Sequence, residues 1–304
     1  MQGARYDFQP MRVDRGGNDA NVLVGCSGEL LRIDGDGNPL HEPITPFPAS
    51  VSGGTVVGES WIGTWVDQEL REARMAALPL NGEWEDGGGR QQLREASNGE
   101  VLMPASSIWA RRLDAEPMAL TSVTKGAVFA TLNRGVYMID DGAKELWRSA
   151  YPEWPGLSKF QHSDTLVSCT EHGDGIALWS RSGSVTFLDG GDGSFVSNHV
   201  VALNSPLARV AYNEEGGWFL MLENGNLGML EDLHAMPQMI KTPGPVFDAK
   251  FSDDRWSWTG WRHDGTYFEG KLEIVQRRDV GIALVGGNVV TNDGRWGAFR
   301  ADLL

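Results

Sequence analysis

The sequence predicts an all-β protein in which about seven units of four short antiparallel strands form a single domain over residues 1–304. Three observations support this fold class. Hairpin patterns recur along the chain, several of their strands are apolar on both faces, and glycine is abundant, with 39 among 304 residues. Abundant glycine favours turns and short strands over long helices.

The stretch WFLMLENGNLGML, residues 218–230, shows the repeating hairpin most clearly. Side chains alternate between the two faces of a strand, and here both faces are apolar. One face carries Trp218, Leu220 and Leu222, and the other carries Phe219 and Met221. Asn224 and Gly225 are predicted to fill the two left-handed positions of a type I′ turn. Such a hairpin belongs in a sheet that is covered on both faces.

The same pattern recurs along the chain, near residues 22–34, 61–80, 127–140, 176–189, 218–230, 256–270 and 288–299. Its predicted turn glycines are Gly28, Gly135, Gly183, Gly225, Gly265 and Gly294. A further strand precedes several hairpins and another follows some of them, as at 117–124 and 145–150. Each unit therefore holds about four strands in roughly 40 to 50 residues.

Antiparallel units that are apolar on both faces predict a β-propeller, whose sheets stack face to face around an axis. A β-sandwich is the alternative, but one face of each of its sheets meets water, so its strands alternate between apolar and polar residues. The last unit ends at Leu304 after its third strand. We expect the N-terminal segment 5–13 to complete that unit and close the ring. Six or eight blades remain alternatives to seven.

At the level of fold, the units resemble the WD-repeat-like propellers over essentially the whole chain. The hairpins end in LRID (31–34), YMID (137–140) or TFLD (186–189), where WD repeats carry Trp-Asp. The resemblance implies a β-propeller fold and transfers no functional residue.

Residues 61–117 depart from the pattern. The stretch 65–82 fits either two strands joined by a charged DQELREAR tip or a short helix that begins at Asp67. We favour the strands, because the position of Gly82 fits a turn that recurs after other hairpins. The polar, glycine-rich segment 85–117 is predicted to be an elaborated connection between blades. Long loops in compact domains are often functional.

The net charge of −15, from 41 acidic and 26 basic residues, disfavours binding to nucleic acid or to an anionic membrane. Cys26 and Cys169 are predicted to be buried reduced thiols; a single disulfide between them would require an oxidising compartment. The N-terminus lacks the apolar core of a signal peptide, and no apolar run is long enough to span a membrane. We expect a cytoplasmic, acidic monomer.

Local motifs give little sign of chemistry. The sequence contains no GxSxG nucleophile elbow, P-loop or HExxH motif. Two acidic, glycine-rich stretches, 33–42 and 188–194, are predicted to be turns rather than Ca²⁺ loops. His162, Cys169, His172 and Asp174 match no zinc spacing and are interpreted as unrelated residues. We therefore expect no metal and no cofactor.

Large aromatic residues are predicted to pack between sheets. Trp256 and Trp258 lie on one face of a strand, and Trp261 lies near the following turn, which His263 and Asp264-Gly265 are expected to form. Each large aromatic side chain buries on the order of 150–250 Å². A sugar-binding platform is the alternative for these tryptophans.

Two hypotheses for function follow. The first is a non-catalytic scaffold that binds another protein. Its candidate surfaces are the hairpin tips Arg134, Arg181, Glu223, His263 and Asp293, and an arginine group in the irregular region, Arg71, Arg74, Arg111 and Arg112. The second is a glycan-binding or small-ligand-binding protein, or a hydrolase or lyase, with its site at the mouth of the central channel.

Overall fold

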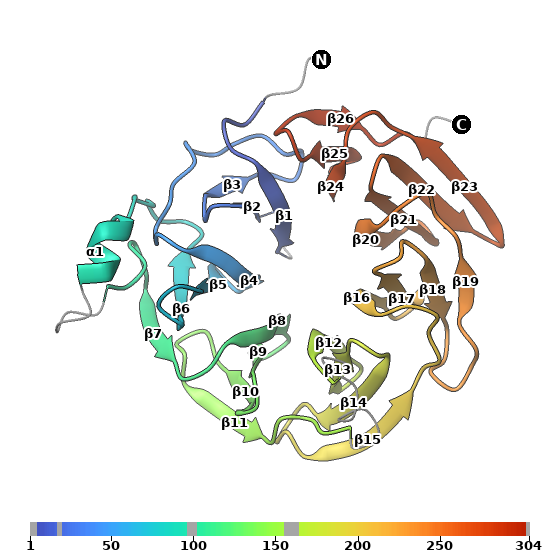
Figure 1. The fold of residues 1–304 in the computed structure, drawn as a ribbon, viewed down its shortest axis with the longest axis horizontal. Coiled ribbons are helices and arrows are strands. Elements are labelled where there is room, and N and C mark those ends of the chain that lie inside the picture. Colours follow the sequence, from blue (N-terminus) through green and yellow to red (C-terminus); the bar gives the residue numbers. More distant parts are fainter. Residues whose placement is uncertain (1–4, 17–19, 96–101, 155–163, 302–304) are drawn as a thin grey trace. The chain divides into compact units, whose positions relative to one another are not determined.

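The computed structural model describes residues 5–16, 20–95, 102–154 and 164–301. The chain divides into two compact units. Unit 1 contains residues 1–6 and 152–304, and unit 2 contains residues 7–151. Each unit is a series of antiparallel sheets that follow one another in chain order (Figure 1).

Unit 2 contains three sheets. The first is β1 (Pro10–Arg15), β2 (Asn21–Gly25) and β3 (Leu30–Ile33); the second is β4 (Ser50–Val57), β5 (Ser60–Asp67), β6 (Glu72–Pro79) and β7 (Trp109–Leu113); the third is β8 (Pro117–Val123), β9 (Gly126–Thr131), β10 (Gly135–Ile139) and β11 (Glu145–Ser149). The first strand of the second sheet, β4, packs against both β1 and β8. The sheets of unit 2 are therefore stacked in the order of the chain.

Unit 1 contains four sheets. The first is β12 (Leu166–His172), β13 (Gly175–Ser180), β14 (Ser184–Asp189) and β15 (Phe195–Val200); the second is β16 (Leu207–Asn213), β17 (Gly217–Leu222), β18 (Leu227–Leu230) and β19 (Gln238–Ile240); the third is β20 (Val246–Ser252), β21 (Arg255–Gly260), β22 (His263–Phe268) and β23 (Lys271–Gln276); the fourth is β24 (Gly281–Val285), β25 (Asn288–Thr291) and β26 (Trp296–Ala298). Their first strands, β12, β16, β20 and β24, lie side by side.

Each predicted hairpin forms, and the prediction of about four strands per unit is confirmed for the sheets that contain β4–β7, β8–β11, β12–β15, β16–β19 and β20–β23. The sheets that contain β1–β3 and β24–β26 have three strands each within the described residues. In the irregular region the strand interpretation is confirmed, because β5 and β6 flank a tip at residues 68–71. Segment 85–117 contains the short helix α1 (Arg90–Glu95) and the fourth strand of its sheet, β7. Its larger part therefore joins β6 to β7 within one sheet, so the prediction of a connection between blades is wrong for that part.

The two-sided apolar strands are buried on both faces. Every residue of β9 and β17 is buried. In β13, every residue after the first is buried. In β17, Trp218, Leu220 and Leu222 pack into a core shared with β13 and β14. Phe219 and Met221 pack on the opposite side, against Trp256 and Trp258 of β21. The alternation predicted at 218–222 thus places one strand between two cores, as a stack of sheets requires.

Four of the hairpin turns share one geometry. Gly28, Gly183, Gly225 and Gly294 have a left-handed φ, and each donates its N–H to the carbonyl three residues earlier. In the 218–230 hairpin the φ of Asn224 is not left-handed, so the predicted type I′ turn is wrong. The turn is a three-residue loop that ends in a left-handed glycine, which is the next commonest hairpin connection.

Two predicted turn glycines lie elsewhere. Gly135 is the first residue of β10, and Asn133 has the left-handed φ of that turn. Gly265 lies inside β22, where a Cβ would approach the Trp258 ring to 2.3 Å, so glycine is required for the close approach of that ring. The turn predicted at His263–Gly265 is therefore wrong, and Arg262 has the left-handed φ there.

The tryptophans of β21 are packing residues, as predicted. Trp256 and Trp258 are buried, and the Trp256 Nε1–H donates to the Gly216 carbonyl at 2.8 Å. Trp261 is exposed. Cys169 is buried and Cys26 is exposed, and both are free thiols, so the prediction of burial is wrong for Cys26. None of the described helices is long and apolar enough to cross a membrane.

The N-terminal segment contributes to both units. Arg5 forms an antiparallel bridge with Arg295, and the Tyr6 N–H donates to the Gly294 carbonyl at 2.9 Å, both within unit 1. Residues 10–15 form β1, which pairs with β2 in unit 2 rather than completing the last sheet. Closure of a ring by this segment stays a prediction.

A buried polar cluster holds the third sheet of unit 1 to the chain that follows it. Asp264 is fully buried and accepts hydrogen bonds from the Thr259 hydroxyl at 2.7 Å, from Arg277 Nη1 at 2.6 Å and from the Arg300 N–H at 3.1 Å. The Arg277 side chain is 5% exposed. Because the ion pair is excluded from water, both charges depend on each other for compensation.

Candidate docking site on strand β15

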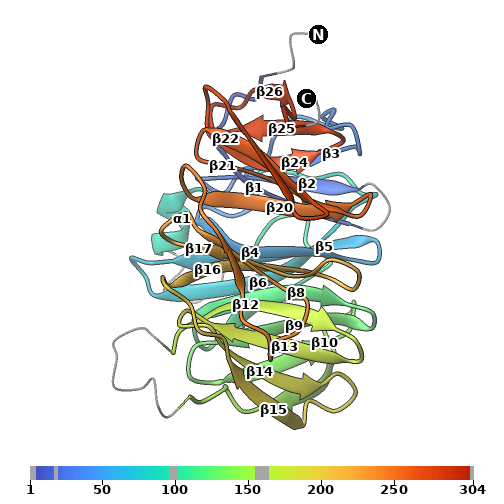
Figure 2. The same cartoon turned by 90° about the vertical axis from the view of Figure 1, so that its right-hand side faces the viewer.

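Strand β15 is the outermost strand of the first sheet of unit 1 (Figures 1 and 2). It pairs with β14 on one edge, and no described strand pairs with its other edge. Large apolar side chains on this strand are exposed: Phe195 to 62%, Val196 to 59% and Val200 to 74%. An exposed, apolar edge strand is a template for pairing with another chain.

The other long outer strands are protected by charge. Natural proteins place charged side chains on edge strands to prevent unwanted pairing. Strand β7 carries Arg111 and Arg112, β11 carries Glu145 and Arg148, and β23 carries Lys271 and Glu273. Strand β15, with the sequence FVSNHV, contains no Lys, Arg, Asp or Glu. Among the described outer strands of five residues or more, β15 alone lacks this protection.

The register of the β14–β15 pair shows which backbone groups remain free. The Val201 N–H donates to the Gly183 carbonyl at 3.0 Å, directly beyond the Ser184–Val200 pair. Hydrogen-bonded and non-hydrogen-bonded pairs alternate along an antiparallel ladder. His199 and Ser197 therefore bond to β14, whereas the N–H groups of Val200 and Asn198 point toward the outer edge, where an added strand would bind.

A pocket of about 670 Å³ adjoins the inner face of β15. Its walls come from the end of β12 and the following turn, the end of β14, strand β15, the start of β17 and the loop after β18. They consist of His172, Asp174, Gly175, Phe187, Leu188, Asp189, Val196, Ser197, His199, Trp218, Glu231, Asp232, Leu233 and His234. The pocket thus lies between the first two sheets of unit 1.

Aromatic rings form a continuous row along this pocket. His172 stacks on Trp218, with ring centroids 5.1 Å apart and planes 19° apart. Phe187 contacts His172 edge-on at 5.2 Å and His199 at 5.8 Å. His199 in turn contacts His234 at 4.6 Å. Burial lowers the pKa of His172 below its usual value, so this ring is neutral at neutral pH.

The pocket is acidic. Among the described residues, its lining contains the carboxylates Asp174, Asp189, Glu231 and Asp232, and no Lys or Arg. Asp189 accepts hydrogen bonds from the N–H groups of Gly191 and Asp192, and Asp232 accepts one from the His234 N–H, so both also cap loops. Asp174 and Glu231 take part in no ion pair among the described residues. These two carboxylates are the groups that a cationic ligand would meet.

The hairpin-tip residues predicted from the sequence lie in varied surroundings. Arg181 and Glu223 form a bidentate ion pair between neighbouring tips, with both N–O distances 2.7 Å. Asp293 pairs with Arg295, and Arg134 is an exposed residue 3.9 Å from Asp114. His263 is fully buried, so its prediction as an exposed tip residue is wrong. Partner binding by the other tips stays a prediction.

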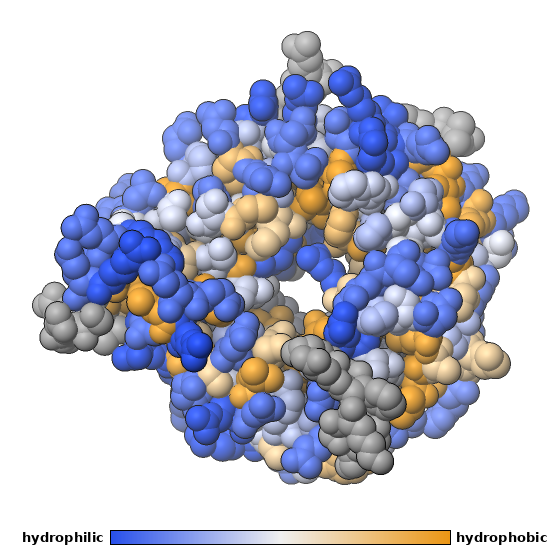
Figure 3. Space-filling view, in the orientation of Figure 1, coloured by the Kyte–Doolittle hydropathy of each residue, from blue (hydrophilic) through white to orange (hydrophobic). Residues whose placement is uncertain are grey.

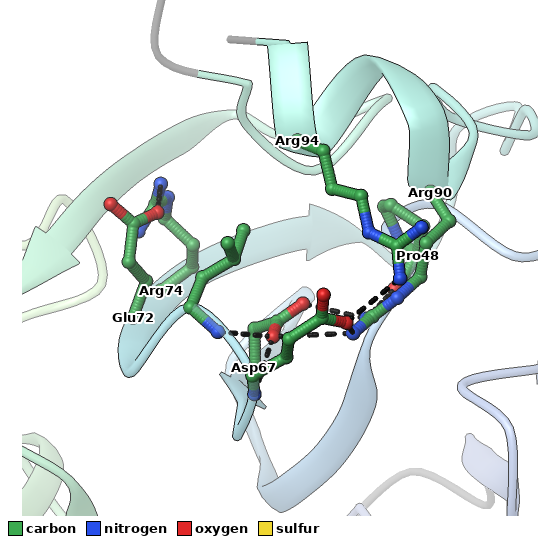
Figure 4. A network of polar contacts seen from close by, with 8 residues as sticks. Pro48, Asp67, Glu72, Arg74, Arg90 and Arg94 are labelled. Atoms are coloured by element: carbon green, nitrogen blue, oxygen red, sulfur yellow. Dashed lines mark hydrogen bonds and ion pairs between the residues drawn. The ribbon is translucent and has the colours of Figure 1, made fainter. Parts of the chain in front are cut away.

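Two of the four predicted arginines, Arg74 and Arg112, pair with one carboxylate in unit 2, and Figure 4 shows Arg74 beside this residue, Glu72. Glu72 pairs with Arg74 at 2.7 Å and with Arg112 at 2.9 Å. The Arg74 side chain is 3% exposed, so it is not available to a partner, contrary to the sequence prediction. Arg111 donates to the Ala143 carbonyl and Arg71 lines a second cavity of about 500 Å³.

Figure 4 also shows how α1 is fastened to the β5–β6 tip. Arg90 pairs with Asp67 at 2.6 Å and with Glu69 at 2.9 Å, and Arg94 pairs with Glu69 at 2.9 Å. Hydrogen bonds from both arginines lower the pKa of Glu69 below its usual value. The helix is strongly hydrophilic, as Figure 3 shows, so these ion pairs and the buried Leu93 hold it to the sheet.

The acidic, glycine-rich stretches are turns. Asp34 Oδ1 accepts hydrogen bonds from the N–H groups of Asp36 and Asn38, and Asp189 caps the second stretch in the same way. No group of His, Cys, Asp and Glu suited to a metal ion occurs among the described residues. His162 lies outside the described residues. Cys169 is buried, whereas His172 and Asp174, predicted to be unrelated residues, line the same pocket.

No protein-family model and no curated protein matches the chain. Several solved structures match the chain. The chain is similar to the WD40 β-propeller domain of Doa1, with a TM-score of 0.67, 10% identity, and coverage of 97% of this chain and 95% of that one. It is also similar to the β-propeller domain of Cps50 (Swd1) from Myceliophteria thermophila, with a TM-score of 0.66, 10% identity and 97% of both chains covered. YCF48 from Cyanidioschyzon merolae matches with a TM-score of 0.60, 14% identity and 98% of both chains covered.

At these identities the similarity shows the fold alone. The chain has an all-β propeller fold similar to that of WD40 domains, with seven sheets among the described residues, as the sequence predicted. Strand β15 was not predicted as a site. Its signal was present in the sequence, because FVSNHV is an uncharged run that directly follows an acidic turn.

Proposed function

We propose that this protein is a non-catalytic scaffold that binds an extended segment of another protein, which adds as a strand to the outer edge of β15. The observation that carries the proposal is the uncharged outer edge with Phe195, Val196 and Val200 exposed. Strand addition derives affinity from backbone hydrogen bonds and specificity from alternate side chains. The similarity to WD40 propeller domains is consistent with a rigid body that presents such an edge.

The charge around β15 argues for a protein as the occupant rather than a membrane or nucleic acid. Four carboxylates line the adjoining pocket, and the whole chain carries −15. Anionic lipids and phosphates are repelled by such a field. Binding of a glycan or a small polar ligand at the channel mouth stays a prediction from the sequence.

The test uses Val200→Pro, which removes an outward N–H while leaving the β14–β15 hydrogen bonds in place. Proline is tolerated on edge strands where its missing N–H faces solvent. Leu272→Pro is the matched control. The Arg277 N–H donates to the Arg262 carbonyl, so alternation along the ladder directs the Leu272 N–H of β23 outward in the same way.

Linear peptides are selected from a random display library on the intact protein and then assayed by amide hydrogen exchange. We expect selected peptides to protect β15 amides, with binding lost in Val200→Pro and kept in Leu272→Pro. Val200→Lys, which leaves the backbone intact, serves as a second variant and should also weaken binding. The proposal would be overturned if the library yields no binder, or if the selected peptides bind both β15 variants as tightly as the wild type.

A further inference from the structure

We propose that the pocket beside β15 is a receptor for an arginine side chain of the bound segment, so the partner is an extended chain with arginine flanked by apolar residues. This inference rests on the proposed docking of a strand at β15. It adds the chemical identity of the residue that the site selects.

The first step is geometric. Ser197 and His199 are two residues apart, so their side chains share one face of β15, and both line the pocket. Directly opposed residues of neighbouring strands have Cβ atoms roughly 5 Å apart. A side chain of the added strand that lies opposite His199 on this face is therefore carried to the mouth of the pocket. Its neighbours along the strand point to the other face, beside Val200.

The second step is electrostatic. Of the described titratable residues that line the pocket, four are carboxylates, three are histidines and none is a permanent cation. Asp174 and Glu231 lie on different elements, the turn after β12 and the loop after β18. Two carboxylates from separate elements on one pocket present acceptors that only a cationic group satisfies without leaving charge uncompensated. The pocket therefore favours a basic side chain.

The third step distinguishes arginine from lysine. The aromatic row from Trp218 through His172 and Phe187 to His199 gives the pocket flat walls. A guanidinium group is planar, stacks on such rings and donates in a fork that matches carboxylates, whereas an ammonium group is a strongly hydrated point charge. The combination of flat aromatic walls and carboxylates suits arginine.

A second copy of this chain is a poor occupant of the same site. Two copies would bring two acidic pockets and two chains of charge −15 together. The exposed apolar side chains would gain contact only against this repulsion. A basic segment gains both the contact and the attraction.

The experiment titrates the intact protein with three pentapeptides, acetyl-Thr-Val-X-Val-Thr-amide, where X is arginine, lysine or citrulline. Citrulline has the shape of arginine without its charge. Binding is followed by the NMR signals of the histidine rings. We expect the arginine peptide to shift the signals of His172, His199 and His234 but not those of His41 and His263. The citrulline peptide should bind at least about tenfold more weakly, with lysine between them.

Variants complete the test. Asp174→Asn and Glu231→Gln should each reduce affinity for the arginine peptide by about tenfold and leave affinity for the citrulline peptide unchanged. Asp254→Asn, an exposed aspartate in the β20–β21 turn of the same unit, is the matched control and should change neither. Equal affinity for arginine and citrulline, or no shift of the three pocket histidines, would overturn the inference.

The two proposals fail in different ways. If Val200→Pro abolishes peptide binding while the arginine and citrulline peptides bind equally, strand addition at β15 is supported and recognition of arginine by the pocket is refuted. If Val200→Pro binds the selected peptides as tightly as the wild type does, strand addition at β15 is refuted, regardless of which ligand the pocket binds.

Discussion

The buried pair of Asp264 and Arg277 provides the sharpest test of how this fold is stabilised. The carboxylate is fully buried and the guanidinium is 5% exposed, and their closest atoms are 2.6 Å apart. Replacing Asp264 by Leu leaves the guanidinium buried without compensation. Breaking a buried ion pair in this way costs about 3–5 kcal/mol of unfolding free energy. For a chain of this size, that corresponds to a fall in melting temperature of roughly 5–8 °C.

The converse change, Arg277→Met, leaves the Asp264 carboxylate with the Thr259 hydroxyl and the Arg300 N–H as donors, and should cost a similar amount. In the double variant neither charge is present. The remaining cost is that of the Thr259 and Arg300 donors, which lose their acceptor, at about 1–3 kcal/mol each. The double variant should therefore lose clearly less stability than the sum of the single variants.

The assay is urea unfolding followed by tryptophan fluorescence for all four members of this cycle. Arg295→Met is the matched control, because its pair with Asp293 is exposed, at 57% and 35%, and should be worth no more than about 1 kcal/mol. Additive losses in the cycle, or an effect of Arg295→Met as large as that of Arg277→Met, would refute the reasoning that burial makes each charge depend on the other.

Three further predictions concern burial and charge elsewhere. Iodoacetamide should alkylate Cys26, because this residue is exposed. It should react with Cys169 only after the protein is unfolded, because Cys169 is buried and its burial raises the pKa of the thiol. Labelling of Cys169 in the folded protein at the rate of Cys26 would contradict this prediction. Burial lowers the pKa of His263, so protonation favours the unfolded state, and stability should fall as the pH drops below the unfolded value of about 6.5. The stability difference between wild type and His263→Asn, from urea unfolding, should then shrink between about pH 7.5 and about pH 5, and a constant difference would count against it. Arg90→Ala should free α1 from the β5–β6 tip and speed amide exchange over residues 90–95. Because it also leaves the buried Asp67 carboxylate without its cation, it should lower the urea midpoint; Gln91→Ala is the control, and an unchanged midpoint for Arg90→Ala would contradict this reasoning.

The sequence predicted the sheets well because the signal for a doubly covered strand is local. Phe219 and Met221 are as apolar as Trp218 and Leu220, and only burial on both faces accounts for that. The turn details were less predictable. Gly265 looked like a turn glycine, yet its role is to admit the Trp258 ring, a contact with a neighbouring strand that spacing along the chain does not reveal. The turn before β22 also lies earlier in the chain than predicted, at Arg262, so His263 belongs to the strand and is buried instead of exposed.

The candidate site was harder to predict than the fold because its parts come from different sheets. His172 and His199 lie on the first and last strands of one sheet, whereas His234 comes from the loop after β18 of the next sheet, so the three line one pocket only after these two sheets have packed together. The burial of Arg74 was not predicted for a related reason, whereas partner binding by Arg71, Arg111 and Arg112 stays a prediction. Arg74 and Arg112 look alike in sequence, but Arg74 lies on the buried β6 and Arg112 on the exposed β7, where Glu72 pairs with both.

The acidity of the chain bears directly on how β15 stays uncharged. An apolar edge without charged residues normally promotes aggregation, because a second copy pairs with it as readily as a partner does. Here the protecting charges stand beside the strand rather than on it, in Asp174, Asp189, Glu231 and Asp232. Charged residues on the strand would oppose pairing with any chain, whereas carboxylates in the adjoining pocket oppose pairing with acidic chains only and attract basic ones. The position of the charges therefore favours a basic partner.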